Sequence, residues 1–85
     1  MNYNSIKQKI KDYIVENYKT RAQELDEQAN LFEAGIVDSI GAFDLAAYLE
    51  ETFSIKFEDE HFFDQRFRSI QGMAAIIMEI LGAED

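Results

Sequence analysis

The sequence contains no cysteine, no proline and no tryptophan among its 85 residues, and its only histidine is His61. Without cysteine the chain has no disulfide, no thiolate nucleophile and no thiolate ligand for zinc or an iron–sulfur cluster. Histidine is the usual general acid or base near neutral pH, and a single histidine offers few ways to form an acid–base catalytic site. We therefore expect a protein that is not an enzyme and that holds no metal ion.

Basic residues are also scarce, with 8 lysines and arginines against 17 aspartates and glutamates. The formal net charge of −9 and the sequence pI near 4.4 oppose binding to nucleic acids and anionic lipid surfaces, and they favour basic partner proteins. A charge of this size also destabilises the folded state by self-repulsion. We therefore expect added salt or divalent cations to raise the melting temperature.

The chain has no long apolar run. The longest extends from Met73 to Met78, far short of the about 20 residues that a membrane-spanning helix needs. The N-terminus lacks the basic segment, apolar stretch and cleavage site of a secretory signal. We expect one cytoplasmic domain over residues 1–85, monomeric and without membrane insertion.

Apolar residues recur at helical spacing in three segments, which predicts three main helices. The first has its apolar face at Tyr3, Ile6, Ile10, Tyr13 and Ile14. The last has Ser69 as its N-cap and Gly82 at its end, and its stripe consists of Ile70, Met73, Ala74, Ile77 and Leu81. Together with a short irregular piece before the last helix, the pattern predicts an all-α bundle of three main helices plus one short helix.

The segment 19–38, between the first and middle helices, is mostly polar and is expected to form a long loop. Four apolar residues interrupt it: Leu25, Leu31, Phe32 and Ile36. A structureless loop of this length is unusual in a small domain. We expect these side chains to hold the loop against the core, and we expect the loop to have a function.

The middle helix, from Asp38 or Ser39 to Phe53, carries two apolar faces. Its inward face consists of Ala42, Leu45, Ala46, Leu49 and Phe53. A second, shorter patch consists of Ile40, Phe43 and Ala47, bordered by Asp44, Glu50 and Glu51. The second patch either packs under the loop or the short helix, or serves as a docking surface with an apolar centre and an acidic rim. Both interpretations stay open for Phe43, and docking is favoured for Ile40, Asp44 and Glu51.

Asp38 and Ser39 stand at the start of this middle helix, where one of them caps the first turn. The backbone N–H groups of a first turn are unpaired, and the helix dipole is positive there. Taken alone, such a pair favours the interpretation of an ordinary capped helix. A phosphate ester on Ser39 would nonetheless be electrostatically accommodated.

The segment 31–40, Leu-Phe-Glu-Ala-Gly-Ile-Val-Asp-Ser-Ile, followed by an acidic amphipathic helix, resembles the acyl carrier protein family. The likeness covers nearly the whole chain, including Ile55 after the middle helix and the Ser-Ile-Gln opening of the last one. The two residues between Gly35 and Asp38, Gly41 after the Asp-Ser-Ile triplet and the Phe63-Asp64 step are similar to D-alanyl and other specialised stand-alone carriers. The residue at 47 is a small alanine, where the family often has a larger apolar residue.

This resemblance implies that Ser39 receives a 4′-phosphopantetheine arm from coenzyme A through a separate, magnesium-dependent phosphopantetheinyl transferase. An acyl- or aminoacyl-activating ligase would then load the thiol of the arm, and a downstream transferase or synthase would unload it. Asp38 would help to position the first transferase. The partner-facing residues would be Ile40, Phe43, Asp44, Ala47, Glu50 and Glu51.

The bulky residues Phe43, Phe62, Phe63 and Phe67 are expected to fill the space between helices in which fatty-acid carriers shelter a chain. We therefore expect a small or polar cargo. Arg66 and Arg68 either relieve local acidic repulsion or neutralise the phosphate-bearing side.

Two other functions stay open. The chain could be an unmodified acidic adaptor that binds a basic protein through the Ile40 face. A small hydrolase built on Ser39 and His61 ranks last, because it lacks a visible orienting acid and oxyanion site. His61 itself, beside Glu58, Asp59 and Glu60, is expected to be a surface helix residue rather than a metal ligand.

Overall fold

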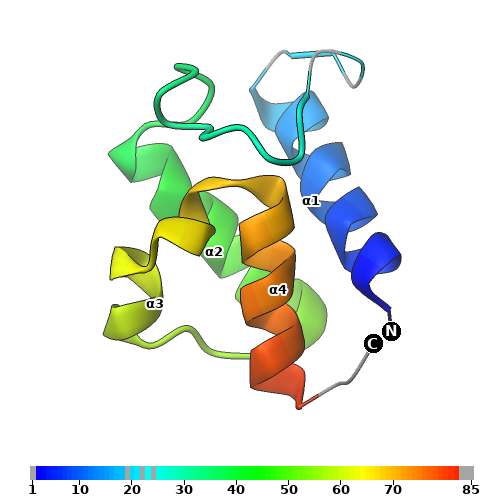
Figure 1. Ribbon diagram of the computed structural model, residues 1–85, viewed down its shortest axis with the longest axis vertical. Helices are drawn as coiled ribbons and strands as arrows, with labels where there is room; N and C mark the ends of the chain where they lie inside the picture. Colours follow the sequence, from blue (N-terminus) through cyan, green and yellow to red (C-terminus); the bar gives the residue numbers. More distant parts are fainter. Residues whose placement is uncertain (1, 19, 22, 24, 83–85) are drawn as a thin grey trace.

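The computed structural model describes residues 2–18, 20–21, 23 and 25–82 (Figure 1). The elements are α1 (Tyr3–Asn17), α2 (Ser39–Phe53), α3 (Asp59–Phe63), the 3-10 helix η2 (Gln65–Arg68) and α4 (Ile70–Leu81). The described ranges contain no strand, which confirms the predicted all-α class with three main helices. The predicted short helix forms two pieces, α3 and η2. Within the same ranges, no helix is long and apolar enough to cross a membrane.

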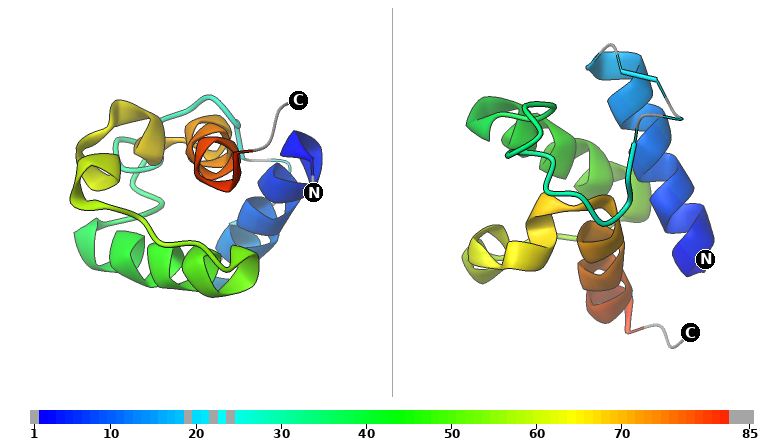
Figure 2. Two further views of the ribbon diagram at one scale, coloured as in Figure 1. Left: turned by 90° about the horizontal axis from the view of Figure 1, so that it is seen from below. Right: turned by 45° about the horizontal axis from the view of Figure 1, so that its top comes forward.

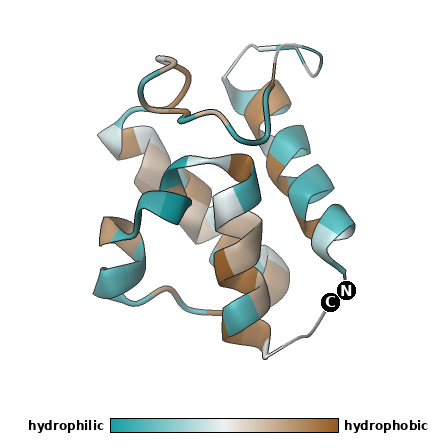
Figure 3. Cartoon of the chain, in the orientation of Figure 1, coloured by the Kyte–Doolittle hydropathy of each residue, from teal (hydrophilic) through white to brown (hydrophobic). Residues whose placement is uncertain are grey.

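The helices surround α4. Figure 2 shows α4 nearly end on, with α1 on one side, α3 and η2 on the other, and α2 along a third side. The long loop between α1 and α2 crosses the top of the bundle and passes close to the start of α4 (Figure 1). Polar residues colour the outer face of α1, whereas α4 is mostly apolar (Figure 3).

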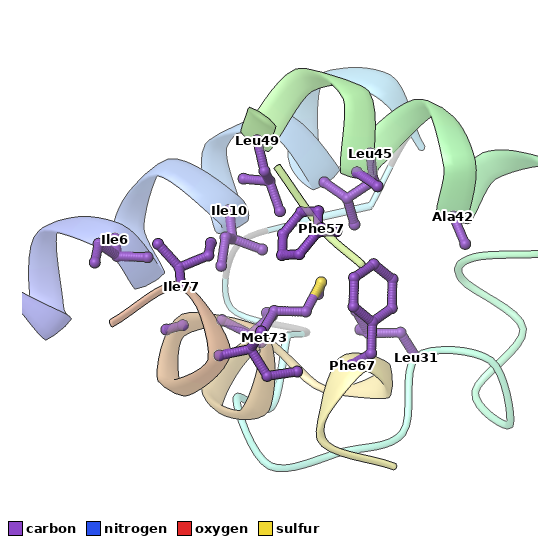
Figure 4. Packing of buried hydrophobic residues seen from close by; sticks show 14 of the residues in the cluster. Ile6, Ile10, Leu31, Ala42, Leu45, Leu49, Phe57, Phe67, Met73 and Ile77 are labelled. Atoms are coloured by element: carbon purple, nitrogen blue, oxygen red, sulfur yellow. The ribbon is translucent and has the colours of Figure 1, made fainter. Parts of the chain in front are cut away.

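A single apolar cluster fills the centre of the bundle (Figure 4). Its fully buried side chains include Ile6, Ile10, Ile14, Leu31, Leu45, Leu49, Ile70, Met73, Ile76 and Ile77. The predicted inward faces of α1 and α2 are confirmed, since every predicted α2 residue is buried and the isoleucines of α1 are fully covered. Ser69 caps α4 by accepting a hydrogen bond from Gly72 N at 2.9 Å, and Gly82 ends the helix with a φ of 68°, both as predicted.

The apolar stripe predicted for α4 differs from the observed set of buried hydrophobic side chains at three residues. Ile76 and Met78 are also buried, because α4 is covered on more than one face, with both α1 and η2 in contact with it. Leu81, by contrast, is 40% exposed. It is the last residue of α4, and this end of α4 lies at the margin of the bundle (Figure 1).

The long loop is held to the bundle by buried side chains and by backbone hydrogen bonds. Leu31 and Val37 are buried, and the other three predicted anchors are partly buried. Leu31 N donates to Arg68 O at 2.8 Å, and Gln71 N donates to Glu27 O at 2.8 Å. The prediction that the loop is held against the core is confirmed, and the anchoring site is the junction of η2 and α4.

Glu27 also ties the loop to α1. Its carboxylate pairs with Lys7 at 2.9 Å and with Lys11. Hydrogen bonds from Lys11 and Lys7 hold the pKa of Glu27 below its ordinary value of 4.5. The loop is thus fixed on both sides, to α1 by the ion pairs of Glu27 and to α4 by the backbone hydrogen bond from Gln71 N.

Candidate functional site

The start of α2 is capped by Asp38, so Ser39 is the first helical residue. Asp38 has an extended backbone, and its Oδ1 accepts a hydrogen bond from Gly41 N at 2.7 Å. Aspartate is among the strongest N-cap residues because its carboxylate satisfies an otherwise unpaired N–H. Ser39 is exposed, and its hydroxyl makes no hydrogen bond within the described part of the chain.

The first turn of α2 is also held from α1. Tyr18, the C-cap of α1, donates a hydrogen bond from its hydroxyl to Gly41 O at 2.9 Å. Burial raises the pKa of Tyr18, and Tyr13, Asp44 and Asp38 raise it further, so the hydroxyl stays protonated and remains a donor. A Cβ at residue 41 would lie 2.7 Å from the Tyr18 hydroxyl oxygen.

Sequence reasoning did not identify Tyr18 as part of this site. The only signal was Gly41 itself, because a glycine inside the first turn of a helix often marks a close approach by another residue. A glycine alone does not say which residue approaches. The contact joins residues that are 23 positions apart in the chain.

Ser39 stands at the edge of an apolar groove of about 290 Å³. The groove is lined by Phe32, Ser39, Ala42, Phe43, Phe62, Phe63, Phe67 and Arg68. It lies between α2, the long loop that precedes α2, and the α3–η2 segment, which is distant from both in sequence. Figure 4 shows three labelled residues from these regions, Ala42, Leu31 and Phe67, on the same side of the core.

The phenylalanines of the groove differ in burial. Phe67 is buried and Phe62 is half-buried, and their ring centroids lie 5.1 Å apart. Phe43 is 64% exposed but also packs on Phe62, with ring centroids 5.5 Å apart. Packing against the short helix therefore leaves most of its side chain exposed for docking. The prediction that Phe63 fills the space between helices is wrong, because its side chain is 82% exposed. Phe63 is the last residue of α3, and it points away from the centre because Phe62 occupies the inward position.

The residues predicted to dock partners lie on one exposed face of α2, except for Glu50, which is half-buried. Ile40 is 76% exposed, and Asp44, Ala47 and Glu51 are exposed as well. Glu50 is half-buried, and its Oε2 accepts a hydrogen bond from Phe57 N at 2.8 Å. This carboxylate therefore helps to hold the segment that connects α2 to α3.

The two arginines of η2 have different surroundings. Arg66 donates to Asp64 Oδ2 at 2.9 Å and to Glu79 Oε1 at 3.1 Å, and these hydrogen bonds lower the pKa of both carboxyl groups. Arg68 lies on the Ser39 groove, with its guanidinium carbon 6.0 Å from the centre of the Phe32 ring. Arg66 thus relieves acidic repulsion, which is one of the two roles left open by the sequence, whereas Arg68 lines the same groove as Ser39.

His61 is used within its own short helix. Its Nδ1 accepts a hydrogen bond from Glu58 N at 2.8 Å, and its ring packs against Phe57. It is not among the residues that line the Ser39 groove. Among the described residues, no three His, Cys, Asp or Glu side chains are placed to hold a metal ion.

The arrangement fits a phosphate-linked arm. An exposed serine hydroxyl stands at a helix start, one cation lies on the adjoining groove, and the groove itself is apolar. The hydroxyl can accept a phosphoryl group, Arg68 can bind the resulting negative charge, and the phenylalanines can contact the apolar parts of an attached chain.

Comparison with known proteins agrees with this arrangement. A family model described as "Phosphopantetheine attachment site" matches residues 8–77, which is most of the chain. A search of the curated proteins found no match. The prosthetic group of this family is 4′-phosphopantetheine. The chain belongs to the family of phosphopantetheine attachment-site domains, and it resembles the acyl carrier proteins.

Proposed function

We propose that Ser39 is the residue that bears 4′-phosphopantetheine, and that this chain carries an acyl or aminoacyl group as a thioester on the thiol of the arm. The observation that carries the proposal is the exposed Ser39 hydroxyl at the capped start of α2, on the rim of an apolar groove. Because the chain has no cysteine, a thioester carrier of this kind must obtain its sulfur from a prosthetic group.

The attachment step is a phosphoryl transfer in which Ser39 is the acceptor. Its Oγ bonds to the phosphorus next to the pantetheine of coenzyme A, while the P–O bond to the adenosine portion breaks and adenosine bisphosphate leaves. The transferase takes the hydroxyl proton and supplies magnesium. Asp38 caps the first turn of α2 through Gly41 N, which holds the backbone that carries Ser39. The chain itself is a substrate in this step and catalyses none of it.

Partner enzymes would bind the exposed face of α2. Ile40 and Phe43 provide the apolar centre, with Ala47 as a shallow neighbour. Asp44 and Glu51 provide exposed carboxylates, and Glu50 adds negative charge from its position beside Phe57. A partner with an apolar pocket surrounded by lysine and arginine complements this face, and the net charge of −9 would speed its approach.

A small or polar cargo is favoured by the packing beside Ser39. Phe57 and Phe67 lie 5.5 Å apart, and Phe62 contacts both, so aromatic rings occupy the space behind the groove. A long acyl chain would have to displace these rings to become sheltered. Chemical-shift changes at the buried Phe57 and Phe67 upon loading a long-chain acyl group would contradict this cargo class.

Intact-mass spectrometry tests the attachment site. The protein is incubated with coenzyme A, magnesium and a phosphopantetheinyl transferase of broad specificity. A mass gain of one phosphopantetheinyl group is expected, and it should disappear in Ser39→Ala. Ser54→Gly is the matched control, because it removes another exposed serine hydroxyl, at a position whose φ of 54° suits glycine.

An unmodified adaptor is the main alternative, because the large apolar side chains of Ile40 and Phe63 are both mostly exposed. In that case no transferase would add mass at Ser39, and the chain from its native host would carry no arm.

A further inference from the structure

We propose, on the basis of Ser39 as the attachment point, that Arg68 binds the phosphodiester that links the arm to the protein. Arg68 thereby fixes the base of the arm against the groove beside Ser39. The ligand class is a singly charged phosphodiester, and Arg68 acts as a positioning residue for it.

The position of Arg68 is fixed by its backbone. Arg68 is the last residue of η2, and its carbonyl oxygen accepts the hydrogen bond from Leu31 N at 2.8 Å. The side chain is half-buried and lines the same groove as Ser39. The backbone of Arg68 is thus held at the junction of η2 and α4, and its side chain lies on the Ser39 side of the bundle.

Arg68 is not committed to a carboxylate. Within the described ranges, no Asp or Glu oxygen lies within ion-pair distance of its guanidinium, in contrast to Arg66, which is held by Asp64 and Glu79. Its contact is with the ring of Phe32, at 6.0 Å from the ring centre. A guanidinium that faces an aromatic ring keeps its in-plane N–H groups available as donors. Arg68 thus lacks a carboxylate partner among the described residues, in a chain that has a net charge of −9 and an excess of carboxylates.

The charge balance at Ser39 favours the same pairing. The carboxylate of Asp38 caps the helix immediately before Ser39, so an attached phosphodiester would stand close to another negative charge. A cation on the adjoining groove offsets that repulsion. Arginine suits this task better than lysine, because its planar N–H groups match two phosphate oxygens at once.

The test compares the protein before and after loading by NMR. The Nε–Hε resonance of Arg68 should shift upon loading, whereas that of Arg66, which is already bound to two carboxylates, should stay in place. Ser39→Ala treated in the same way should leave the Arg68 resonance unchanged. The ³¹P resonance of the loaded wild-type protein should differ from that of the same protein unfolded in urea.

Arg68→Gln should move the ³¹P resonance at least halfway toward the unfolded value. Lys56→Gln is the matched control for the loss of one positive charge, because Lys56 is exposed beyond the far end of α2, about 20 Å along the helix from Ser39. It should leave the ³¹P resonance in place, and Arg68→Lys should restore only part of the wild-type shift.

A mass gain without any change at Arg68, or an unchanged ³¹P resonance in a folded Arg68→Gln variant, would overturn this inference while leaving the proposed function intact. The absence of a mass gain at Ser39 would overturn both.

Discussion

Gly72 lies directly against the backbone of η2, and its replacement by alanine should strongly destabilise the fold. A Cβ at this position would lie 1.9 Å from Arg66 O and 2.5 Å from the Arg66 carbonyl carbon. These are backbone atoms, so no side-chain rotation relieves the clash, and η2 would have to retreat from α4 by about 1 Å. Alanine gains up to about 1 kcal/mol in helix propensity, which offsets only part of the overpacking cost.

We expect a net loss of about 2 kcal/mol or more in the free energy of unfolding for Gly72→Ala. For a domain of this size, that loss corresponds to a fall of roughly 10 °C in the melting temperature. Because η2 carries Phe67 and Arg68, its displacement should also loosen the Ser39 groove. Thermal unfolding followed by circular dichroism measures the first effect, and the rate of mass gain at Ser39 measures the second.

Gly41→Ala is the matched control. Gly41 and Gly72 both occupy the third position of a helix, and both donate their N–H to the N-cap side chain, at 2.7 and 2.9 Å. At Gly41, however, the nearest atom is the hydroxyl oxygen at the end of the flexible Tyr18 side chain. Displacing this hydroxyl would break its hydrogen bond to Gly41 O. The loss costs about 1 kcal/mol and is balanced by the gain in helix propensity from alanine. Equal melting temperatures for the two variants would refute the reasoning from backbone contact.

Three further predictions follow from the charges. The pKa of Glu27 is lowered in the folded state by Lys11 and Lys7, so its stabilising effect is complete above its ordinary value of 4.5 and is lost as the pH falls through the folded pKa. Glu27→Gln should remove that part of the acid dependence seen in urea unfolding, and an unchanged pH profile would contradict the pairing. Magnesium or sodium chloride should raise the melting temperature by screening the net charge of −9, so a melting temperature indifferent to salt would count against self-repulsion. Reversing the charge of Asp44 or Glu51 should slow the transferase more at low than at high ionic strength, and equal slowing at both would exclude electrostatic steering.

The local features of this fold could be predicted from sequence, whereas contacts between distant segments could not. Periodicity located the three main helices, and the types of Asp38 and Ser69 located two helix starts, because each of these signals depends on neighbouring residues alone. Periodicity cannot say how many elements cover a helix, which is why the burial of Ile76 was missed. The same limit applies to Phe63, whose exposure depends on Phe62 taking the inward position.

The candidate site shows the same division. The exposed Ser39 hydroxyl and the acidic face of α2 followed from one helix, but the contact of Tyr18 with Gly41 O and the position of Arg68 on the groove depend on how three segments pack. The sequence left neutralisation of the phosphate-bearing side open for both Arg66 and Arg68, and it could not say which of the two lies on the groove. Arg68, the cation that lines the same groove as Ser39, comes from η2.

The junction of η2 and α4 therefore controls the site although it lies far from Ser39 in sequence. Leu31 and Gln71 make the backbone hydrogen bonds that hold the long loop there, and the same junction delivers Arg68 to the groove. A change that shifts this junction should therefore alter the loop side and the η2 side of the groove together, while Asp38 still caps the first turn of α2. Recognition by partners through the exposed face of α2 should consequently be separable from the seating of the arm, because the two depend on different anchors.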